Sequence, residues 1–133
     1  FMHGDSLNSQ IWLFWKDHST VDRYAESEQF LATKVSVGLN SFFFAFVYAK
    51  FLAQDREALW RDLDGIISDS DPWFVGGDFN VVASPKEKQG SGSFPRTASQ
   101  AFVSFMATSG LLDVGFEGDK FTWCNNQRGG RRT

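Results

Sequence analysis

The sequence has little cysteine and no long hydrophobic run. Its single cysteine, Cys124, cannot form a disulfide within the chain, so nothing points to an oxidising compartment. We expect Cys124 to pack as a small hydrophobic residue in a strand. No apolar run approaches the roughly 18 residues of a transmembrane helix, since the longest, residues 42–47, has the length of a strand. No signal-peptide pattern is present either, and we expect no membrane association and no disulfide partner.

The chain also lacks an excess of positive charge. It carries 13 Lys and Arg residues against 16 Asp and Glu residues, which gives a net charge of −3 at pH 7. This balance excludes a strongly basic nucleic-acid-binding surface over the whole chain, although a local basic patch is compatible with it. Aromatic residues are plentiful, with 15 Phe and 5 Trp, so the 133 residues can build the core of one modest domain.

Hydrophobic patterning predicts several short strands. They fall at residues 11–15, 30–37, 42–48, 73–75 and 121–123, with a further extended piece at 111–114. The 30–37 and 42–48 runs flank a four-residue turn signal and should form a hairpin. Because the 42–48 run is apolar on both faces, we expect it to be central in the sheet and covered on both sides.

Apolar residues at helical spacing predict helices at 55–68 and 97–109. Pro72 stops the first helix, and Gly110 is suited to cap the second. Residues 84–96 are predicted to be loop. Strands alternating with helices indicate an α/β chain, and the hairpin indicates a mixed sheet with packed helices.

The most informative stretch is Val-Gly-Gly-Asp-Phe-Asn at residues 75–80. Gly76 and Gly77 allow a tight turn or a close approach to a ligand. On an extended chain, Asp78 and Asn80 would point to the same face at the end of a buried strand, where α/β proteins bind ligands. A carboxylate that can orient a water beside a carboxamide that can bind an anion suits phosphate-ester hydrolysis. The same residue types are also common in turns, so the motif alone leaves both interpretations open.

Three landmarks occur in one order along the chain. They are Phe-Val-Tyr-Ala-Lys at 46–50, Trp-Phe-Val-Gly-Gly-Asp-Phe-Asn at 73–80, and Gly-Phe at 115–116 followed by Phe-Thr-Trp at 121–123. This order resembles the endonuclease/exonuclease/phosphatase superfamily. More closely, it resembles the apurinic-type endonuclease domain of plant non-LTR (LINE-type) retrotransposons, whose Ile-Trp strand is similar to residues 11–15. The resemblance implies a partial α/β sandwich of the DNase I-like type.

The resemblance also implies residue roles. Asp78 matches the Asp that positions and deprotonates the attacking water, and Asn80 matches the Asn that holds the scissile phosphate. Tyr48 matches a phosphate-contacting Tyr or His, and Thr122 matches a supporting Thr. In-line attack on a phosphodiester needs such a base and such donors, together with a divalent metal. The implied cofactor is Mg²⁺, with ligands unknown, and the implied partner of the parent domain is DNA. The location is left unknown, and a nuclear location is expected only if the parent acts on chromosomal DNA. Without the resemblance, Tyr48 could be a half-buried aromatic residue at the end of a strand, and Thr122 could be an ordinary β-branched strand residue with no role in a site.

Two elements of the family pattern have no counterpart here. One is an early Asn followed by a metal-binding Glu, for which Glu26 and Glu28, expected in a polar loop, do not qualify. The other is a final Ser-Asp-His segment, whose His neither His3 nor His18 can replace. We therefore expect residues 1–133 to form a single incomplete domain, a fragment that is inactive alone.

Two other functions stay open. The same superfamily includes phosphoinositide phosphatases, sphingomyelinases and deadenylases, and Asp78 and Asn80 serve only the phosphate. The chain could also be a degenerate, non-enzymatic remnant whose basic residues touch phosphate or are simply solvated; these are Lys86, Lys88 and Arg96 in the loop and Arg128, Arg131 and Arg132 in the tail. Unpaired sheet edges and many aromatic residues predict poor solubility.

Overall fold

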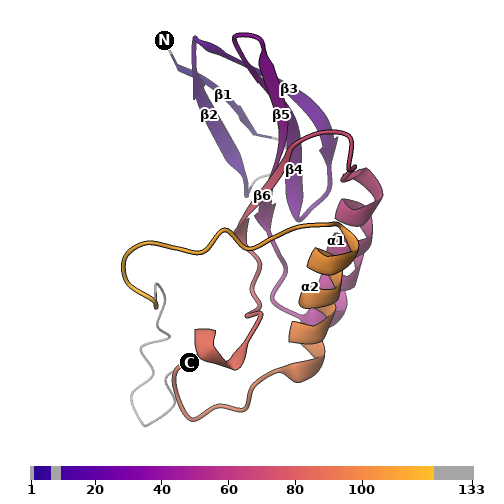
Figure 1. The fold of residues 1–133 in the computed structure, drawn as a ribbon, viewed down its shortest axis with the longest axis vertical. Coiled ribbons are helices and arrows are strands. Elements are labelled where there is room, and N and C mark those ends of the chain that lie inside the picture. The colour runs from indigo at the N-terminus through magenta and orange to yellow at the C-terminus, as the bar shows by residue number, and fades with distance from the viewer. Residues whose placement is uncertain (1, 7–9, 122–133) are drawn as a thin grey trace. The chain divides into compact units, whose positions relative to one another are not determined.

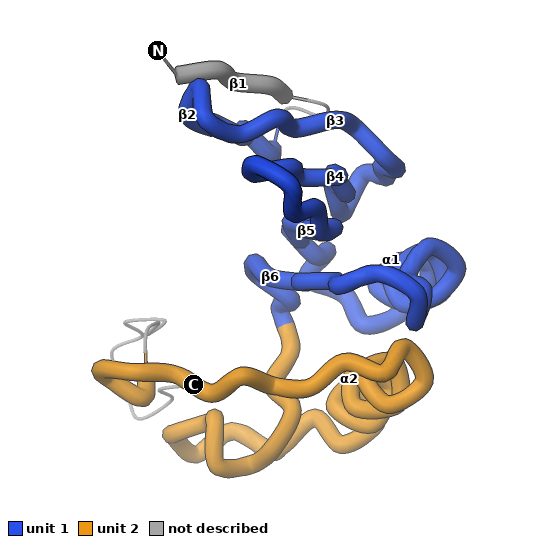
Figure 2. The backbone as a smooth tube through the Cα atoms, turned by 45° about the horizontal axis from the view of Figure 1, so that its top comes forward, with its two compact units in different colours: residues 1–80 blue, residues 81–133 orange. Residues whose placement is uncertain are grey.

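The computed structural model of the protein describes residues 2–6 and 10–121. The chain divides into two compact units, residues 1–80 and residues 81–133 (Figure 2). In the described residues, the first unit contains all the strands and helix α1, and the second contains a short 3-10 helix and helix α2 (Figure 1). The prediction of an α/β chain with a mixed sheet and two helices is therefore confirmed.

The first unit has two sheets. The smaller sheet pairs β1 (Met2–Ser6) with β2 (Trp12–Lys16) in antiparallel fashion. The larger sheet has the strand order β3–β4–β5–β6, with bounds Ser19–Glu26, Phe30–Val37, Asn40–Tyr48 and Trp73–Asp78. Its first three strands are antiparallel neighbours, whereas β6 runs parallel to β5.

Helix α1 (Ala53–Ile66) makes the crossover that a parallel strand pair requires, because β5 and β6 run in the same direction. Its side chains Leu59, Trp60 and Leu63 are buried. Together with buried residues of the sheet they form the core of this unit; the sheet contributes Phe30, Leu31, Ala32, Phe43, Ala45 and Val47. The carboxyl ends of β5 and β6 therefore lie side by side, one before the helix and one after it.

Strand β5 is central, as predicted, but it is fully covered on one face only. Phe43, Ala45 and Val47 are buried, whereas the alternating Phe42, Phe44 and Phe46 are half-buried. On this second face the rings of Phe44 and Phe46 stack at 4.2 Å between centroids. Aromatic rings packed on one another thus shield part of each other's surface in place of a covering layer.

The main differences from prediction concern polar strands and short turns. Strand β3 was not predicted, because its sequence Ser-Thr-Val-Asp-Arg-Tyr-Ala-Glu is too polar for a buried run, and β1 was missed for the same reason. Glu26 was expected in a loop but ends β3. The four-residue turn is shorter than predicted, since β5 begins at Asn40 and Gly38 adopts φ +59°. Residues 111–114 form no strand.

The second unit centres on α2 (Arg96–Thr108), with Phe102 and Phe105 buried. Within the predicted loop, Pro85–Glu87 forms a 3-10 turn, and the Ser99 hydroxyl donates to the Val82 carbonyl at 2.6 Å. Gly110 is in the left-handed region at φ +67° and caps α2 as predicted. The Gly110 and Leu111 N–H groups donate to the last turn of the helix, which is a Schellman motif.

Candidate functional site

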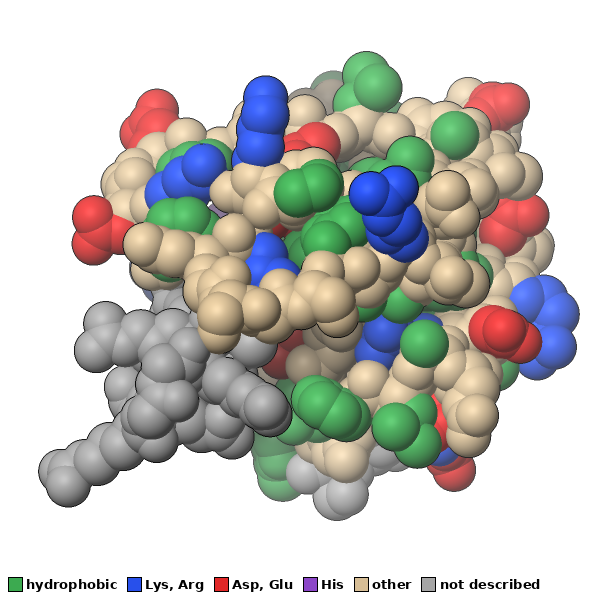
Figure 3. Space-filling model, turned by 90° about the horizontal axis from the view of Figure 1, so that it is seen from below, with side chains coloured by type: hydrophobic (Ala, Val, Ile, Leu, Met, Phe, Trp, Pro, Cys, Tyr) green, Lys and Arg blue, Asp and Glu red, His purple; other side chains and the backbone are tan. Residues whose placement is uncertain are grey.

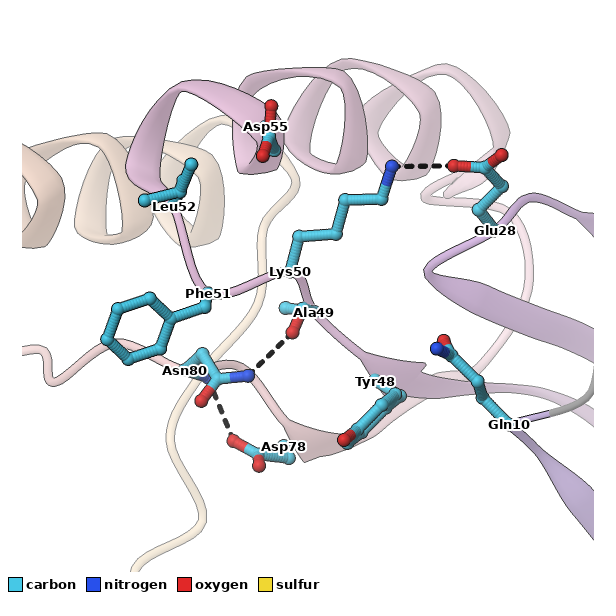
Figure 4. A pocket seen from close by; sticks show the side chains of 10 residues that line it. All are labelled: Gln10, Glu28, Tyr48, Ala49, Lys50, Phe51, Leu52, Asp55, Asp78 and Asn80. Carbon is cyan, nitrogen blue, oxygen red and sulfur yellow. Dashed lines mark hydrogen bonds and ion pairs between the residues drawn. The ribbon is translucent and has the colours of Figure 1, made fainter. Parts of the chain in front are cut away.

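The candidate site is an open pocket in the first unit at the carboxyl ends of β5 and β6 (Figure 4). Its volume of about 830 Å³ lies in the range of small-molecule and cofactor sites. Ten residues line it: Gln10, Glu28, Tyr48, Ala49, Lys50, Phe51, Leu52, Asp55, Asp78 and Asn80. Three of the four predicted site residues, Tyr48, Asp78 and Asn80, are among them. The fourth, Thr122, lies outside the described residues.

Tyr48 and Asp78 are brought together by the strand register. They are Cα partners in the parallel pairing of β5 with β6, so their side chains leave the same face of the sheet next to each other. The Ala49 N–H donates to the Asp78 carbonyl at 2.8 Å and extends this pairing by one residue beyond the strand end. Tyr48 is 46% exposed and lines the pocket.

Gly77 permits this pairing for a reason that differs from the expected one. The sequence predicted that Gly76 and Gly77 allow a tight turn or a close approach to a ligand, but β6 continues through both to Asp78. Gly77 has φ +139°, and a Cβ added there would lie 2.0 Å from the Val47 carbonyl oxygen. The glycine is therefore needed because the backbone of β6 approaches the backbone of β5, and no ligand has to be invoked.

Asp78 and Asn80 are also close, although the chain between them is not extended. Asn80 has φ +49°, a left-handed conformation that Asn tolerates better than most residues. Its backbone N–H donates to Asp78 Oδ1 at 2.9 Å, and its side-chain Nδ2 donates to the Ala49 carbonyl at 2.6 Å. The expectation of an extended Asp78–Asn80 segment is thus wrong, and a hydrogen-bonded turn brings the two side chains together instead.

Two residues that the sequence reasoning missed hold the loop between β5 and α1. Arg56 is 4% exposed, and its Nη1 donates to the carbonyls of Lys50 and Phe51 at 3.1 and 2.6 Å. Gln29 is 5% exposed; its Nε2 donates to the Asp55 carbonyl, and its Oε1 accepts the Lys50 N–H, at 2.9 and 2.8 Å. Burial lowers the pKa of the Arg56 guanidinium. No signal in the sequence points to this arrangement, because Arg56 is one of several charged residues in α1.

The pocket also carries an ion pair at its edge. Lys50 Nζ lies 2.6 Å from a carboxylate oxygen of Glu28, and both side chains are exposed. The hydrogen bond and the charge of Lys50 lower the pKa of Glu28, and Glu28 raises the pKa of Lys50 in return. Glu28 lies in the turn between β3 and β4, as expected of a polar loop residue.

The arrangement has the chemistry to bind an anion and orient a water, but it offers few metal ligands. Among the described residues, no group of three or more His, Cys, Asp and Glu side chains is placed to hold a metal ion. Asp78 supplies one carboxylate, and Mg²⁺ is commonly held by one or two carboxylates with water and substrate phosphate. The fit to Mg²⁺ is therefore partial. His18, which was not expected to contribute, lies in the turn between β2 and β3.

The three basic residues of the predicted loop differ in their exposure. Lys88 is half-buried and donates to the Ser93 carbonyl at 2.9 Å, whereas Lys86 and Arg96 are exposed. Figure 3 shows one face of the molecule, on which Lys and Arg side chains (blue), Asp and Glu side chains (red) and hydrophobic side chains (green) all reach the surface. Cys124 and the three tail arginines, Arg128, Arg131 and Arg132, lie outside the described part of the chain. No helix in residues 2–6 and 10–121 is long and apolar enough to span a membrane.

No protein-family model matches this chain, and no curated protein sequence matches it.

Proposed function

We propose that this chain is part of a phosphodiesterase of the endonuclease/exonuclease/phosphatase superfamily, with a DNase I-like fold and DNA as its substrate. The proposed parent is a nicking endonuclease of a LINE-type retrotransposon. One observation carries the proposal: Tyr48, Asp78 and Asn80 line one pocket at the carboxyl ends of two adjacent parallel strands. Ligands of open α/β sheets bind at that edge.

Each of the three side chains retains a group for the reaction. Asp78 uses Oδ1 to accept the Asn80 N–H, so Oδ2 is available to orient and deprotonate the attacking water. Asn80 donates one Nδ2 hydrogen to Ala49, and the second hydrogen can bind a phosphate oxygen. The Tyr48 hydroxyl, on the neighbouring strand end, supplies a further donor. Donors fixed in place before charge develops are the strongest stabilisers of such a transition state.

Mg²⁺ is the proposed cofactor, with Asp78 as the described residue that would hold it. When bound, it would supply charge neutralisation at the phosphate. Among the described residues, no group of three or more His, Cys, Asp and Glu side chains is placed to hold a metal ion, and the family pattern calls for a Glu that has no counterpart in the 133 residues. For this reason, and because the essential His is also lacking, we expect the 133-residue chain to be inactive alone.

A polynucleotide is favoured over other phosphoesters by the aromatic residue beside the site. Phe51 is 83% exposed at the pocket, next to Asn80 (Figure 4). Its backbone is held by Arg56, so the ring is presented from a fixed loop. Bases stack on exposed aromatic side chains with little sequence preference, whereas an inositol headgroup has no such flat aromatic face. If that DNA is chromosomal, the parent protein would act in the nucleus.

A plasmid-nicking assay with Mg²⁺ tests the proposal. It compares the 133-residue chain with a version extended at both ends to supply the Glu and His segments, and each with its Asp78→Asn variant. We expect nicking only by the extended chain, lost in Asp78→Asn. An extended, folded chain that fails to nick DNA but hydrolyses an inositol phosphate would favour the other phosphoesterases. A folded chain that does neither would favour a non-enzymatic remnant.

A further inference from the structure

Lys50 is a charged side chain of the pocket that the proposed chemistry does not use. It follows the end of β5 by two residues and lines the pocket with Tyr48, Asp78 and Asn80. Its Nζ lies on the side of the pocket away from Asp78, where it meets Glu28 (Figure 4). The pocket thus has acceptor and donor groups at the strand ends and a cation across from them.

The backbone of Lys50 is fixed, but its side chain is free to change partner. Its N–H donates to Gln29 Oε1, and its carbonyl accepts from Arg56 Nη1. By contrast, Glu28 is the one hydrogen-bonding partner of Nζ among the described residues, and the two side chains are 47% and 81% exposed. Exposed ion pairs contribute little to stability. An incoming anion can therefore replace Glu28 at small cost.

We propose that Lys50 is a second phosphate-binding residue of this pocket and that Glu28 competes with the substrate for it. This inference rests on the proposed function, because a phosphodiester anion beside Asn80 is the ligand that Lys50 would meet. A lysine ammonium group is a compact charge on a flexible stem with three rotatable donors, which suits a phosphate oxygen. Without substrate, Glu28 neutralises this charge, and its own carboxylate repels other anions from the edge of the pocket.

Two substitutions separate attraction from competition. Lys50→Met removes the charge and keeps most of the stem, so it should weaken phosphate binding. Glu28→Gln frees Lys50 and removes a repelling charge, so it should strengthen binding. The chain offers a matched control pair in Arg61 and Asp62, the exposed ion pair of α1 with Nε and Oδ1 3.5 Å apart, which does not line the pocket. Arg61→Met and Asp62→Asn change the net charge equally.

The experiment is a titration of the ¹⁵N-labelled 133-residue chain with dimethyl phosphate, a small phosphodiester anion, followed by the amide resonances of residues 48–51 and 78–80. We expect Lys50→Met to raise the dissociation constant about two- to fivefold, the range of one exposed charge pair. Glu28→Gln should lower it by a similar factor, Lys50→Arg should restore binding, and both control variants should match the parent chain.

Several outcomes would overturn the inference. Equal dissociation constants for Lys50→Met and the parent chain would show that Lys50 makes no contact, and equal losses in Lys50→Met and Arg61→Met would reduce it to a general charge effect. Weaker binding by Glu28→Gln would disprove competition, and an absence of shifts in the pocket would remove the site. Failure of the proposed function is seen separately, as a lack of nicking by the extended chain, and leaves these binding constants measurable.

Discussion

Asp78 lies directly opposite Tyr48 in the parallel register of β6 on β5, and the Asp78 carbonyl accepts the N–H of the next residue, Ala49. Ala49 in turn accepts the side chain of Asn80 through its own carbonyl. All three proposed catalytic residues are therefore linked to the backbone of Ala49. A small shift between the ends of β5 and β6 should change the positions of all three side chains.

Gly77→Ala should destabilise the protein strongly. The new Cβ would lie 2.0 Å from the Val47 carbonyl oxygen, and φ +139° is unfavourable for any side chain. We expect a loss of about 2–4 kcal/mol in the free energy of unfolding, measured by urea denaturation. Gly76→Ala is the control, because its nearest neighbour would be Phe44 Cζ at 3.6 Å, an ordinary contact. Similar losses in the two variants would contradict the close approach of β6 to β5.

Asn80 should be replaceable by glycine at lower cost than by alanine. Both variants lose the hydrogen bond to the Ala49 carbonyl, but only alanine must also adopt φ +49°. Since the left-handed region costs an L-residue about 1–2 kcal/mol, Asn80→Ala should be less stable than Asn80→Gly by roughly 1 kcal/mol. Thermal or chemical unfolding of the two variants measures this difference. In the extended chain both should lose nicking activity, whatever their stability.

Arg56→Met should destabilise the loop between β5 and α1. Its guanidinium is buried and donates to the carbonyls of Lys50 and Phe51, which would be left without partners. We expect a cost of about 2–3 kcal/mol in the free energy of unfolding, because hydrogen bonds from a charged group contribute about 1.5–3 kcal/mol. The exposed Arg61→Met provides the comparison and should change stability by less than about 0.5 kcal/mol. Equal effects would mean that Arg56 does not hold the loop.

The pH titration of Glu28 should report its ion pair with Lys50. Lys50 lowers the pKa of Glu28 below its ordinary 4.5, so the contribution of the pair is present above pH 4.5 and is lost as the pH falls through the lowered value. An NMR titration of the Glu28 carboxyl should show a midpoint below 4.5 that rises toward 4.5 in Lys50→Met. Saturating dimethyl phosphate should shift the midpoint in the same direction. An unchanged midpoint in Lys50→Met would rule out the pairing.

Phe51→Ala should distinguish a polynucleotide from a bare phosphodiester. The exposed ring lies beside Asn80, where it can stack on a base. We expect the variant to bind a short single-stranded DNA about fivefold or more weakly, and dimethyl phosphate unchanged. Fluorescence anisotropy and NMR titration give the two constants. Equal binding of the DNA by both chains would remove the support for a nucleic-acid substrate.

The elements that could be predicted from the sequence are those with strong apolar patterns. β4 and β5 were found because nonpolar and β-branched residues dominate them, and α1 and α2 were placed within two residues because their apolar stripes are regular. The polar strand β3 gave no such signal, since an edge strand pairs through its backbone and can carry Asp22 and Arg23. Hydrophobic periodicity indicates which side chains are buried, so it gives no signal for a strand whose side chains are mostly exposed.

The candidate site could be predicted in part. The three side chains at the strand ends follow from a short motif and a register that places Tyr48 beside Asp78. Gln29 and Arg56, which hold the loop between β5 and α1, could not be predicted in this way. Their hydrogen-bonding partners are main-chain carbonyl and amide groups, which occur in nearly every residue. The Lys50–Glu28 pair likewise depends on a contact across 22 positions of the chain.

Because position 77 requires glycine, any amino-acid substitution there should disrupt the site, even though Gly77 has no side chain to take part in the chemistry. Every missense change there adds a Cβ, so each one would push apart the two strand ends. A related sequence could keep Tyr48, Asp78 and Asn80 and still have lost the geometry of the site. The proposed site should therefore be considered intact in such a sequence only if it also has glycine at the position of Gly77.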